Sequence, residues 1–195
     1  MSVVPIILAA GESTRMGRSK PLLDFDGRSA LQLAVDACRP MRPIVVLGHE
    51  HAAVRKNVRD VILVVNLDYA SGRTSSLKAG LRVLPAEAEA FLLHPVDCPL
   101  ITAAIVEGVV EGWRASKKPI VIPSHSMRRG HPVLFAAALK KEFLALGDDE
   151  SARNVVNADP ARVQYVEAPE ECLIDMDTPE EYERCLARYR GSKNR

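Results

Sequence analysis

Residues 3–20 of the chain read VVPIILAAGESTRMGRSK, an apolar run followed directly by a loop rich in glycine, hydroxyl and basic side chains. An apolar run without in-and-out alternation, here residues 3–9, is typical of a parallel strand that is covered on both faces. The loop after it holds Gly11 and Gly17 among three cationic side chains. Ligands of open α/β sheets bind at the carboxyl ends of the strands, so this loop predicts an anion site there.

The alternation of apolar runs and amphipathic stretches continues down the chain. Strands are expected at 43–47, 61–65, 90–93 and 120–122, and helices at 31–37, 52–58, 75–84 and 102–117. This order predicts the α/β class, with a three-layer αβα, Rossmann-like sheet that is mostly parallel. The alternation loosens after residue 122, and we interpret the second half as an insertion that closes over the sheet's edge within the same domain.

Composition and length narrow the class of protein. The 195 residues are 47% hydrophobic and 26% charged, which predicts one folded domain at 1–190 and a frayed polar tail at 191–195. A formal net charge of +1 argues against nucleic acid as a partner. The N-terminal apolar run is too short to span a membrane, so no membrane partner is expected. Four cysteines without a C-x-x-C pair indicate reduced thiols and a cytoplasmic location.

The first loop can neutralise an anion through Arg15 and Lys20, while its glycines let backbone N–H groups approach a phosphate. Its spacing differs from the common G-x-x-x-x-G-K-[ST] and G-x-G-x-x-G phosphate-binding patterns. Judged by these residues alone, a phosphate-binding loop and a surface turn with incidental basic residues are equal alternatives.

Asp97 follows the apolar run at 90–93, at the expected mouth of the sheet. A carboxylate there can hold Mg²⁺, which binds through one or two carboxylates and keeps waters and substrate phosphates as its other ligands. The alternative is a capping role for the next helix. Thr102 lies nearer the start of that helix and can cap it, so Asp97 is left without a structural role.

A second carboxylate, Asp177, precedes a complete helix start. Thr178 can act as the N-cap, Pro179 as the first helical residue, and Glu181 as the reciprocal residue of a capping box. Capping therefore does not require Asp177, which leaves it as the second candidate metal ligand. Asp175 is the alternative to it.

Five segments of the chain carry a family resemblance. They are LAAGESTRMGRSKPL at 8–22, SSLKAGL at 75–81, PVDCPL at 95–100, RGHPVLF at 129–135 and DMDTPEEY at 175–182. Together they resemble the signatures of nucleotidyltransferases with the nucleotide-diphospho-sugar transferase fold. Within that superfamily the chain is most similar to the molybdenum cofactor cytidylyltransferases and their guanylyltransferase relatives.

The resemblance implies a role for individual residues in these segments. The catalytic residues would be Lys20, Arg15 and Asp97, and Mg²⁺ would be held by Asp97 and Asp177. The nucleotide would be bound by Leu8, Ala9, Ala10, Gly11, Ser13, Gly17, Gly72, Ser75 and Ser76. The acceptor would be bound by Arg129, His131, Asp149 and Arg153.

Some positions depart from the family pattern or allow a second interpretation. Relatives often carry Gly-Met before the two serines, whereas this chain has Gly72-Arg73-Thr74. Arg73 then either adds a phosphate contact or is solvated. Ser151 stands where the acceptor segment of relatives has glycine. His131 has a structural alternative, because a lone histidine is more often a hydrogen-bonded packing residue than a catalyst.

The function implied is transfer of CMP from CTP to the phosphate of molybdopterin or the molybdenum cofactor, with release of pyrophosphate. A molybdoenzyme apoprotein would receive the product through transient contact. CTP is expected over GTP because the chain has Ala-Ala-Gly at 9–11, where guanylyl relatives tend to have Ala-Gly-Gly. The alternatives are guanylyl transfer to the same cofactor, nucleotidyl transfer to a sugar phosphate, and a non-catalytic protein that delivers nucleotide or cofactor.

Overall fold

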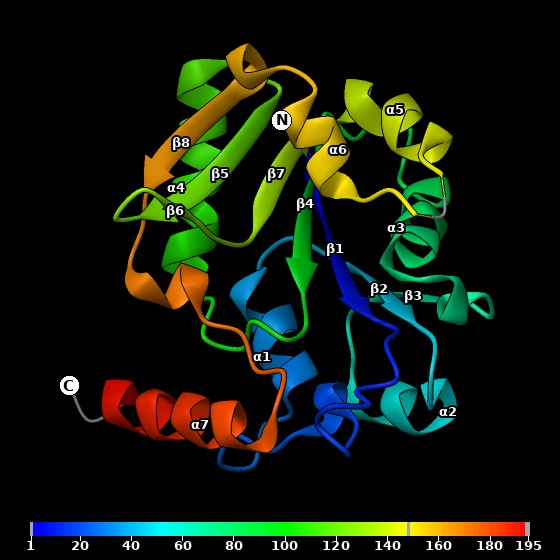
Figure 1. Cartoon of the computed structure of the whole chain (residues 1–195), viewed down its shortest axis with the longest axis vertical. Helices are drawn as coiled ribbons and strands as arrows, with labels where there is room; N and C mark the ends of the chain where they lie inside the picture. Colours follow the sequence, from blue (N-terminus) through cyan, green and yellow to red (C-terminus); the bar gives the residue numbers. More distant parts are fainter. Residues whose placement is uncertain (1, 148, 194–195) are drawn as a thin grey trace.

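The computed structural model describes residues 2–147 and 149–193 (Figure 1). Within them an eight-stranded sheet has the order β3-β2-β1-β4-β7-β5-β6, and β8 pairs with β5. The strands are β1 (Val3–Ala9), β2 (Ile44–Leu47), β3 (Ile62–Val65), β4 (Ala90–Pro95), β5 (Ile120–His125), β6 (Arg128–Arg129), β7 (Val133–Ala136) and β8 (Val163–Glu167). The helices are α1 (Ala30–Ala37), α2 (His51–Val54), α3 (Arg73–Arg82), α4 (Ala103–Ser116), α5 (Lys140–Ala145), α6 (Ala152–Asn157) and α7 (Pro179–Lys193).

Most neighbouring strands are parallel, as the sequence predicts. β1 pairs in parallel with β2 and β4, β2 with β3, and β5 with β8. β7 is antiparallel to both of its neighbours, β4 and β5. In the register of β1 and β4, Leu8 lies opposite Pro95, so the two strands end side by side at one edge of the sheet.

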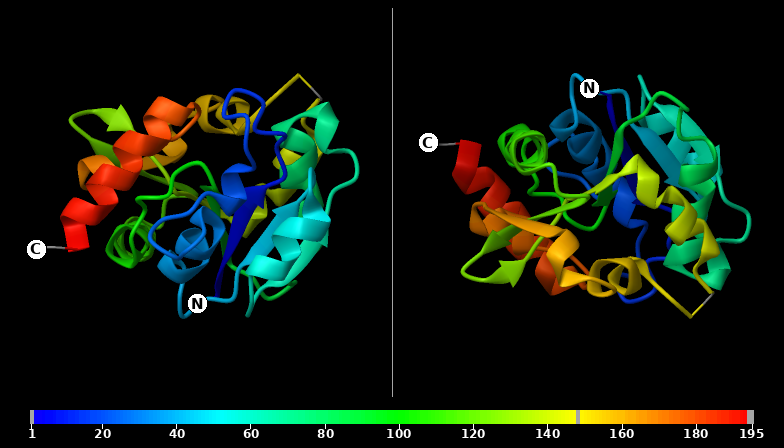
Figure 2. Two further views of the ribbon diagram at one scale, coloured as in Figure 1. Left: turned by 90° about the horizontal axis from the view of Figure 1, so that it is seen from below. Right: turned by 90° about the horizontal axis from the view of Figure 1, so that it is seen from above.

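Helices cover both faces of the sheet and form the predicted αβα layers (Figure 2). One core cluster joins α1 and α4 to the strands through side chains such as Leu31 and Trp113. The other joins α3, α5 and α6 to the opposite face through side chains such as Leu81 and Phe143. Because β2 and β4 are buried along their whole length, their sequences are apolar without alternation.

A third core cluster fastens α7 to the first loop. Met16 of that loop is buried in it together with Met176, which precedes α7. The rings of Phe25 and Tyr182 meet edge to face with centroids 5.5 Å apart. This packing brings the start of α7 beside the first loop, although 157 positions separate Lys20 from Asp177 in the sequence.

The second half of the chain differs from the expected insertion over the sheet's edge. β7 lies inside the sheet, between β4 and β5, and β8 extends the sheet beyond β5. β8, α5 and α6 have no counterpart among the expected elements. β7 is four residues long and pairs with β4, about 40 positions earlier (Leu134 with Leu92), and with β5, about 15 positions earlier (Phe135 with Ile120). Non-local pairing of this kind leaves no local pattern in the sequence.

Two other expected elements are altered in detail. β3 is the edge strand on its side of the sheet, and Leu63 and Val65 are exposed on its uncovered face. The helix expected at 52–58 ends at Val54 and is followed by a single 3₁₀ turn, Arg55–Asn57.

The C-terminal segment is more regular than a frayed tail. α7 continues to Lys193, so residues 191–193 are helical, while residues 194 and 195 lie outside the described part of the chain. Among the helices described, none combines the length and apolarity that crossing a membrane would need.

Candidate active site

A cavity of about 560 Å³ opens at the carboxyl ends of β1 and β4. Its walls come from the end of β1 with the first loop, the start of α3, the end of β4, and the start of α6 together with His131. Polar segments that follow different strands therefore meet at one edge of the sheet, where ligands of α/β sheets bind.

Backbone hydrogen bonds hold the first loop at this edge. The amide of Val96 donates to the carbonyl of Leu8, and the amide of His49 donates to the carbonyl of Ala10, each at 3.1 Å. The loop also closes on itself, because Ser13 Oγ accepts from the amide of Lys20 at 3.1 Å. Lys20 is therefore held in place before any ligand arrives.

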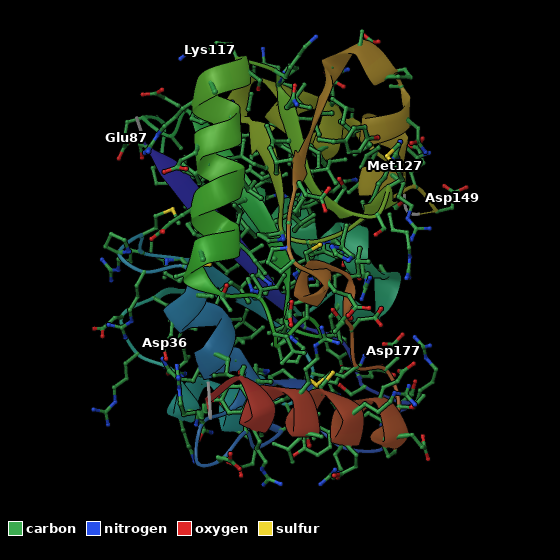
Figure 3. The ribbon with its side chains drawn as sticks, turned by 90° about the vertical axis from the view of Figure 1, so that its left-hand side faces the viewer. Asp36, Glu87, Lys117, Met127, Asp149 and Asp177 are labelled. Atoms are coloured by element: carbon green, nitrogen blue, oxygen red, sulfur yellow. The ribbon has the colours of Figure 1, made fainter. Side chains whose placement is uncertain are left out.

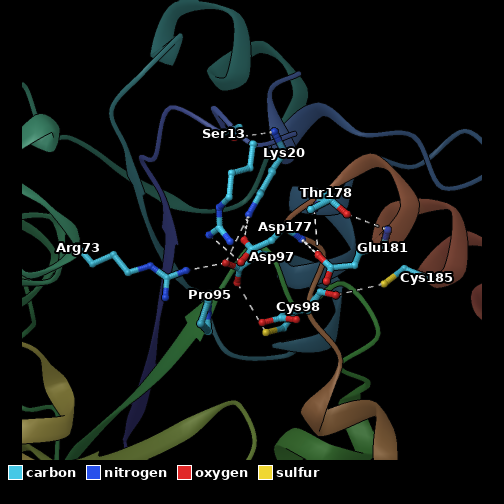
Figure 4. A network of polar contacts seen from close by, with 12 residues as sticks. Ser13, Lys20, Arg73, Pro95, Asp97, Cys98, Asp177, Thr178, Glu181 and Cys185 are labelled. Atoms are coloured by element: carbon cyan, nitrogen blue, oxygen red, sulfur yellow. Dashed lines mark hydrogen bonds and ion pairs between the residues drawn. The ribbon is translucent and has the colours of Figure 1, made fainter. Parts of the chain in front are cut away.

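Lys20 lies between two aspartates from distant parts of the chain (Figure 4). Its Nζ donates to Asp177 Oδ1 and lies 3.8 Å from Asp97 Oδ2. Arg15 Nη2 is 2.8 Å from Asp177 Oδ2, and Arg73 Nη2 is 2.6 Å from Asp97 Oδ2. The side chains of Lys20 and Asp97 are 13% and 10% exposed, so water screens their interaction only weakly.

Neither aspartate is used to cap a helix. Thr102 caps α4, since its Oγ1 accepts from the amide of Ile105 at 3.4 Å. At α7 the capping box forms as predicted: Thr178 Oγ1 accepts from the amide of Glu181 at 3.3 Å, and Glu181 Oε2 accepts from the amide of Thr178 at 3.0 Å. The carboxylates of Asp97 and Asp177 are left to face the cavity's cations.

Electrostatics distinguish Asp177 from the alternative, Asp175. The hydrogen bond from Lys20 holds the pKa of Asp177 below its ordinary value. Burial, followed by the neighbouring carboxylates of Asp177 and Asp97, raises the pKa of Asp175. The cations of the site therefore contact Asp177, whereas Asp175 experiences mainly the negative charges of Asp177 and Asp97.

Most of the expected nucleotide-binding residues line the cavity. They are Leu8, Ala9, Ala10, Gly11, Ser13, Gly72 and Ser76. Lys20 and Asp97 line it as well, and so do His131 and Arg153 from the expected acceptor side. Arg15 and Asp177 are not part of the cavity wall and adjoin it through Lys20, which pairs with Asp177. The catalytic and binding roles stay predictions.

Gly17 and Ser75 are not part of the cavity wall. Gly17 has a φ of 68°, a left-handed conformation that glycine adopts without strain, and so it allows the loop to turn. Ser75 Oγ lies 2.8 Å from the carbonyl oxygens of both Asp68 and Gly72, and so closes the turn that precedes α3. The second serine of the pair, Ser76, is the one that reaches the cavity.

Two residues expected to bind the acceptor also lie elsewhere. The guanidinium of Arg129 donates to Asn157 Oδ1 at 3.1 Å and lies over the ring of Tyr165. Asp149 is exposed and is well separated from Asp177 in Figure 3. In both cases the chain turns the side chain outward. The segments named by the resemblance lie near the cavity, but these two side chains are not part of its wall.

Tyr69, which no sequence motif singles out, contributes an aromatic ring to the cavity. Its Oη is 3.4 Å from His49 Nδ1. Gly48 makes room for this ring, because a Cβ there would lie 2.6 Å from both Tyr69 Cβ and the carbonyl oxygen of Ala10. The sequence gives little indication that Tyr69 lines the cavity, because an aromatic residue just after an edge strand is common on protein surfaces.

Two histidines, the buried His94 and the half-buried His131, lie beside the cavity. Nε2 of His94 and Nδ1 of His131 have no hydrogen-bond partner within the described residues. Burial lowers the pKa of each imidazole to about 4. Both histidines are therefore neutral near pH 7, and His131 offers an uncharged ring to the cavity.

The burial of His94 predicts a loss of stability in mild acid. The unfolded chain binds a proton at His94 below about pH 6.5, whereas the native state resists protonation down to about pH 4. The free energy of unfolding should therefore fall as the pH falls through this window, with His94 contributing on the order of 2 kcal/mol between pH 7 and pH 5. Urea unfolding at the two pH values measures the loss.

The His94→Asn variant should flatten this pH dependence, whatever its effect on stability at pH 7. His51→Asn, on the short helix α2, is the matched control and should leave the dependence unchanged. An unaltered slope in His94→Asn would contradict the assignment of a buried neutral histidine.

Known proteins resemble the chain along nearly its whole length. A family model described as a MobA-like NTP transferase domain matches residues 5–164. The molybdenum cofactor cytidylyltransferase of Escherichia coli (strain K12) is 27% identical over 190 residues, which cover 94% of this chain and 95% of that protein. Nicotine blue oxidoreductase of Paenarthrobacter nicotinovorans is 29% identical over 199 residues, with 94% and 96% covered.

A solved structure shares the fold along nearly the whole chain. The crystal structure of the Mycobacterium tuberculosis Rv0371c homologue from Mycobacterium sp. strain JC1 superposes with a TM-score of 0.83 and 27% sequence identity, covering 97% of each chain. The family match at 5–164 includes Lys20, Arg73 and Asp97 and ends before Asp177.

Proposed function

Because the chain belongs to the MobA-like NTP transferase family, we propose that it transfers CMP from CTP to the phosphate of molybdopterin or the molybdenum cofactor. The chain is a nucleotidyltransferase, and the finer proposal concerns its base and its acceptor. One observation carries the proposed chemistry: Lys20, held by the first loop, lies between the carboxylates of Asp97 and Asp177 at the mouth of the cavity.

The reaction we propose is an in-line displacement. An oxygen of the acceptor's phosphate forms a bond to the α-phosphorus, the bond from that phosphorus to the bridging oxygen breaks, and pyrophosphate leaves with the electron pair. A terminal phosphate is largely ionised near neutral pH, so no general base is needed. The chain's task is to position the two phosphates and to neutralise the charge on them, for which Lys20 and Arg15 are suited.

The acidic residues suit a divalent cation of the Mg²⁺ type. Asp97 and Asp177 offer oxygen ligands from two loops that meet at Lys20. Within the described residues no group of three or more histidine, cysteine or acidic side chains could enclose a metal. That donor set matches Mg²⁺, which takes one or two carboxylates and completes its shell with water and phosphate oxygens. When bound, the ion would neutralise phosphate charge.

The acceptor would enter from the side of His131 and Arg153, opposite the first loop. Both residues line the cavity, and α3 holds this side in place. Thr74 Oγ1 donates to the carbonyl of Glu150, and Lys78 Nζ donates to the carbonyl of Leu146 at 2.5 Å. A cationic guanidinium beside an uncharged imidazole suits an acceptor that carries both a phosphate and a polar ring system.

The choice of base is expected to depend on Ala10. This residue is 5% exposed, lines the cavity and is backed by Gly48 and Tyr69. Its methyl group takes space that a purine would need, and one methyl is worth about 1–3 kcal/mol, or roughly 10- to 200-fold in kcat/KM. We therefore expect CTP to be used in preference to GTP, and Ala10→Gly to raise GTP use while CTP use persists.

A nucleotide panel tests both the reaction and the base. Purified molybdenum cofactor is incubated with the protein, Mg²⁺ and CTP, GTP, ATP or UTP, and pyrophosphate release and the dinucleotide product are quantified. The proposal requires both products with CTP. Equal kcat/KM for CTP and GTP would contradict the role of Ala10. Pyrophosphate release with a sugar phosphate instead, or redox turnover without pyrophosphate release, would contradict the proposed acceptor or the proposed reaction.

A further inference from the structure

Asp97, the carboxylate best placed to hold a metal, is covered by an arginine at the start of α3. Arg73 is the first residue of α3, and its Nη2 lies 2.6 Å from Asp97 Oδ2. Lys20 Nζ, which pairs with Asp177, comes closest to Asp97 at the same oxygen, Oδ2, at 3.8 Å. The other oxygen, Oδ1, faces Cys98 Sγ at 3.7 Å, within the protein. Arg73 therefore occupies the outward-facing oxygen of Asp97.

A divalent cation and Arg73 compete for that oxygen. Mg²⁺ binds carboxylate oxygens at about 2.0–2.1 Å, so an ion on Oδ2 would lie within a few ångströms of the guanidinium. The two positive charges also repel each other strongly at such a separation. A metal on Asp97 is therefore disfavoured while the guanidinium stays in place, and favoured once it has moved away.

Arg73 is free to make that movement, whereas Asp97 is not. Its side chain is 76% exposed, and its long stem starts at the end of a helix. Asp97 is held inside the site, with its carbonyl accepting from the amide of Met176 at 2.9 Å. Arg73 also lines the cavity, so a rotated guanidinium stays within reach of a ligand bound there.

We propose that Arg73 is an exchangeable counter-ion, which covers Asp97 in the free protein and moves to the nucleotide's phosphates when the metal–nucleotide complex binds. The inference rests on the proposed function. The exchange is favourable because the triphosphate offers the guanidinium planar pairs of oxygens in place of the single carboxylate oxygen it gives up. Arg73 thereby disfavours the metal alone and favours the metal together with nucleotide.

The test measures two affinities that should change in opposite directions. Mn²⁺ binding without nucleotide is followed by the electron paramagnetic resonance signal of the free ion, and CTP binding with Mn²⁺ and without acceptor is followed by calorimetry. In Arg73→Met we expect Mn²⁺ alone to bind about 3- to 10-fold more tightly, because the competing cation is gone. CTP with Mn²⁺ should bind about 3- to 10-fold more weakly, because a phosphate contact is lost.

Matched variants separate this behaviour from a general effect on the fold. Arg73 is mostly exposed at the first position of α3, so Arg73→Met should fold. Arg73→Lys keeps the charge and should stay within about 3-fold of the unaltered protein for Mn²⁺ alone. Arg82→Met removes the same charge from the exposed end of α3 and should change neither affinity. When Asp97→Asn is combined with Arg73→Met, the double variant should no longer show the tighter Mn²⁺ binding of Arg73→Met alone.

The outcomes divide cleanly. Opposite changes in Arg73→Met, absent from Arg82→Met, support the exchange. Weaker or unchanged Mn²⁺ binding, or unchanged CTP binding, in Arg73→Met would overturn it while the proposed function stands, provided that the unaltered protein binds both ligands. Failure of the unaltered protein to bind CTP with Mn²⁺ would overturn the proposed function, and the exchange with it.

Discussion

Asp97→Ala should lower kcat by about 10³-fold or more while the protein stays folded. Removal of the carboxylate takes away the better shielded of the two candidate metal ligands, and charge neutralisation by a bound metal is worth several kcal/mol in reactions of this kind. Turnover is measured as pyrophosphate release under saturating CTP, Mg²⁺ and acceptor. Raising Mg²⁺ should not restore it, because the lost ligand determines where the ion sits.

The stability of the Asp97→Ala protein should be close to that of the unaltered protein. Arg73 is mostly exposed and returns to water, and Lys20 keeps its partner Asp177. The free energy of unfolding should fall by no more than about 2 kcal/mol, because the lost carboxylate lines the cavity and its truncation opens no void in the core. Asp36→Ala serves as the control, because Asp36 also pairs with arginines but lies away from Asp177 (Figure 3). Normal turnover in Asp97→Ala, or an equal loss in Asp36→Ala, would rule out the metal role.

The parts of the site that depend on strand and helix ends could be predicted from the sequence. An apolar run followed at once by polar residues marks the carboxyl end of a buried strand, and this places the first loop and Asp97 at one edge of the sheet. The capping box at Thr178 and Glu181 is equally local, and it identifies Asp177 as a residue that the helix does not need. Signals of this kind are visible in the sequence because each lies within a few residues of the element it marks.

The remaining features depend on contacts between distant segments. Whether Arg73 meets a carboxylate or water is decided by the approach of β4 to the start of α3, which no pattern around residue 73 records. Arg129 is similar: its neighbours in the sequence match the family, but β6 turns its side chain toward α6 and β8. Family resemblance therefore identified the segment of each residue, while side-chain direction required the tertiary structure.

Lys20 shows how the two kinds of information combine. Its place in the first loop is local, since Ser13 Oγ accepts from its amide. Its partners Asp97 and Asp177 come from the turn after β4 and from the segment before α7, and the cluster around Met16 and Met176 brings the latter close. The ammonium group is thus held between two carboxylates, which is the arrangement expected of a group that stabilises charge in a transition state without first having to reorient.

Lys20→Ala should therefore lower the rate of the chemical step by about 10²- to 10³-fold, the usual cost of losing one preorganised charge-stabilising group. CTP binding should weaken much less, by about 10-fold or under, because the charge that Lys20 meets grows as pyrophosphate leaves. Single-turnover rates and equilibrium binding of CTP measure the two effects separately. Lys118→Ala, which removes a lysine that donates to the carbonyl of Ala161 at 2.7 Å and does not line the cavity, should change neither. If Lys20→Ala raised KM and left the single-turnover rate intact, Lys20 would contribute uniformly to binding and not to catalysis.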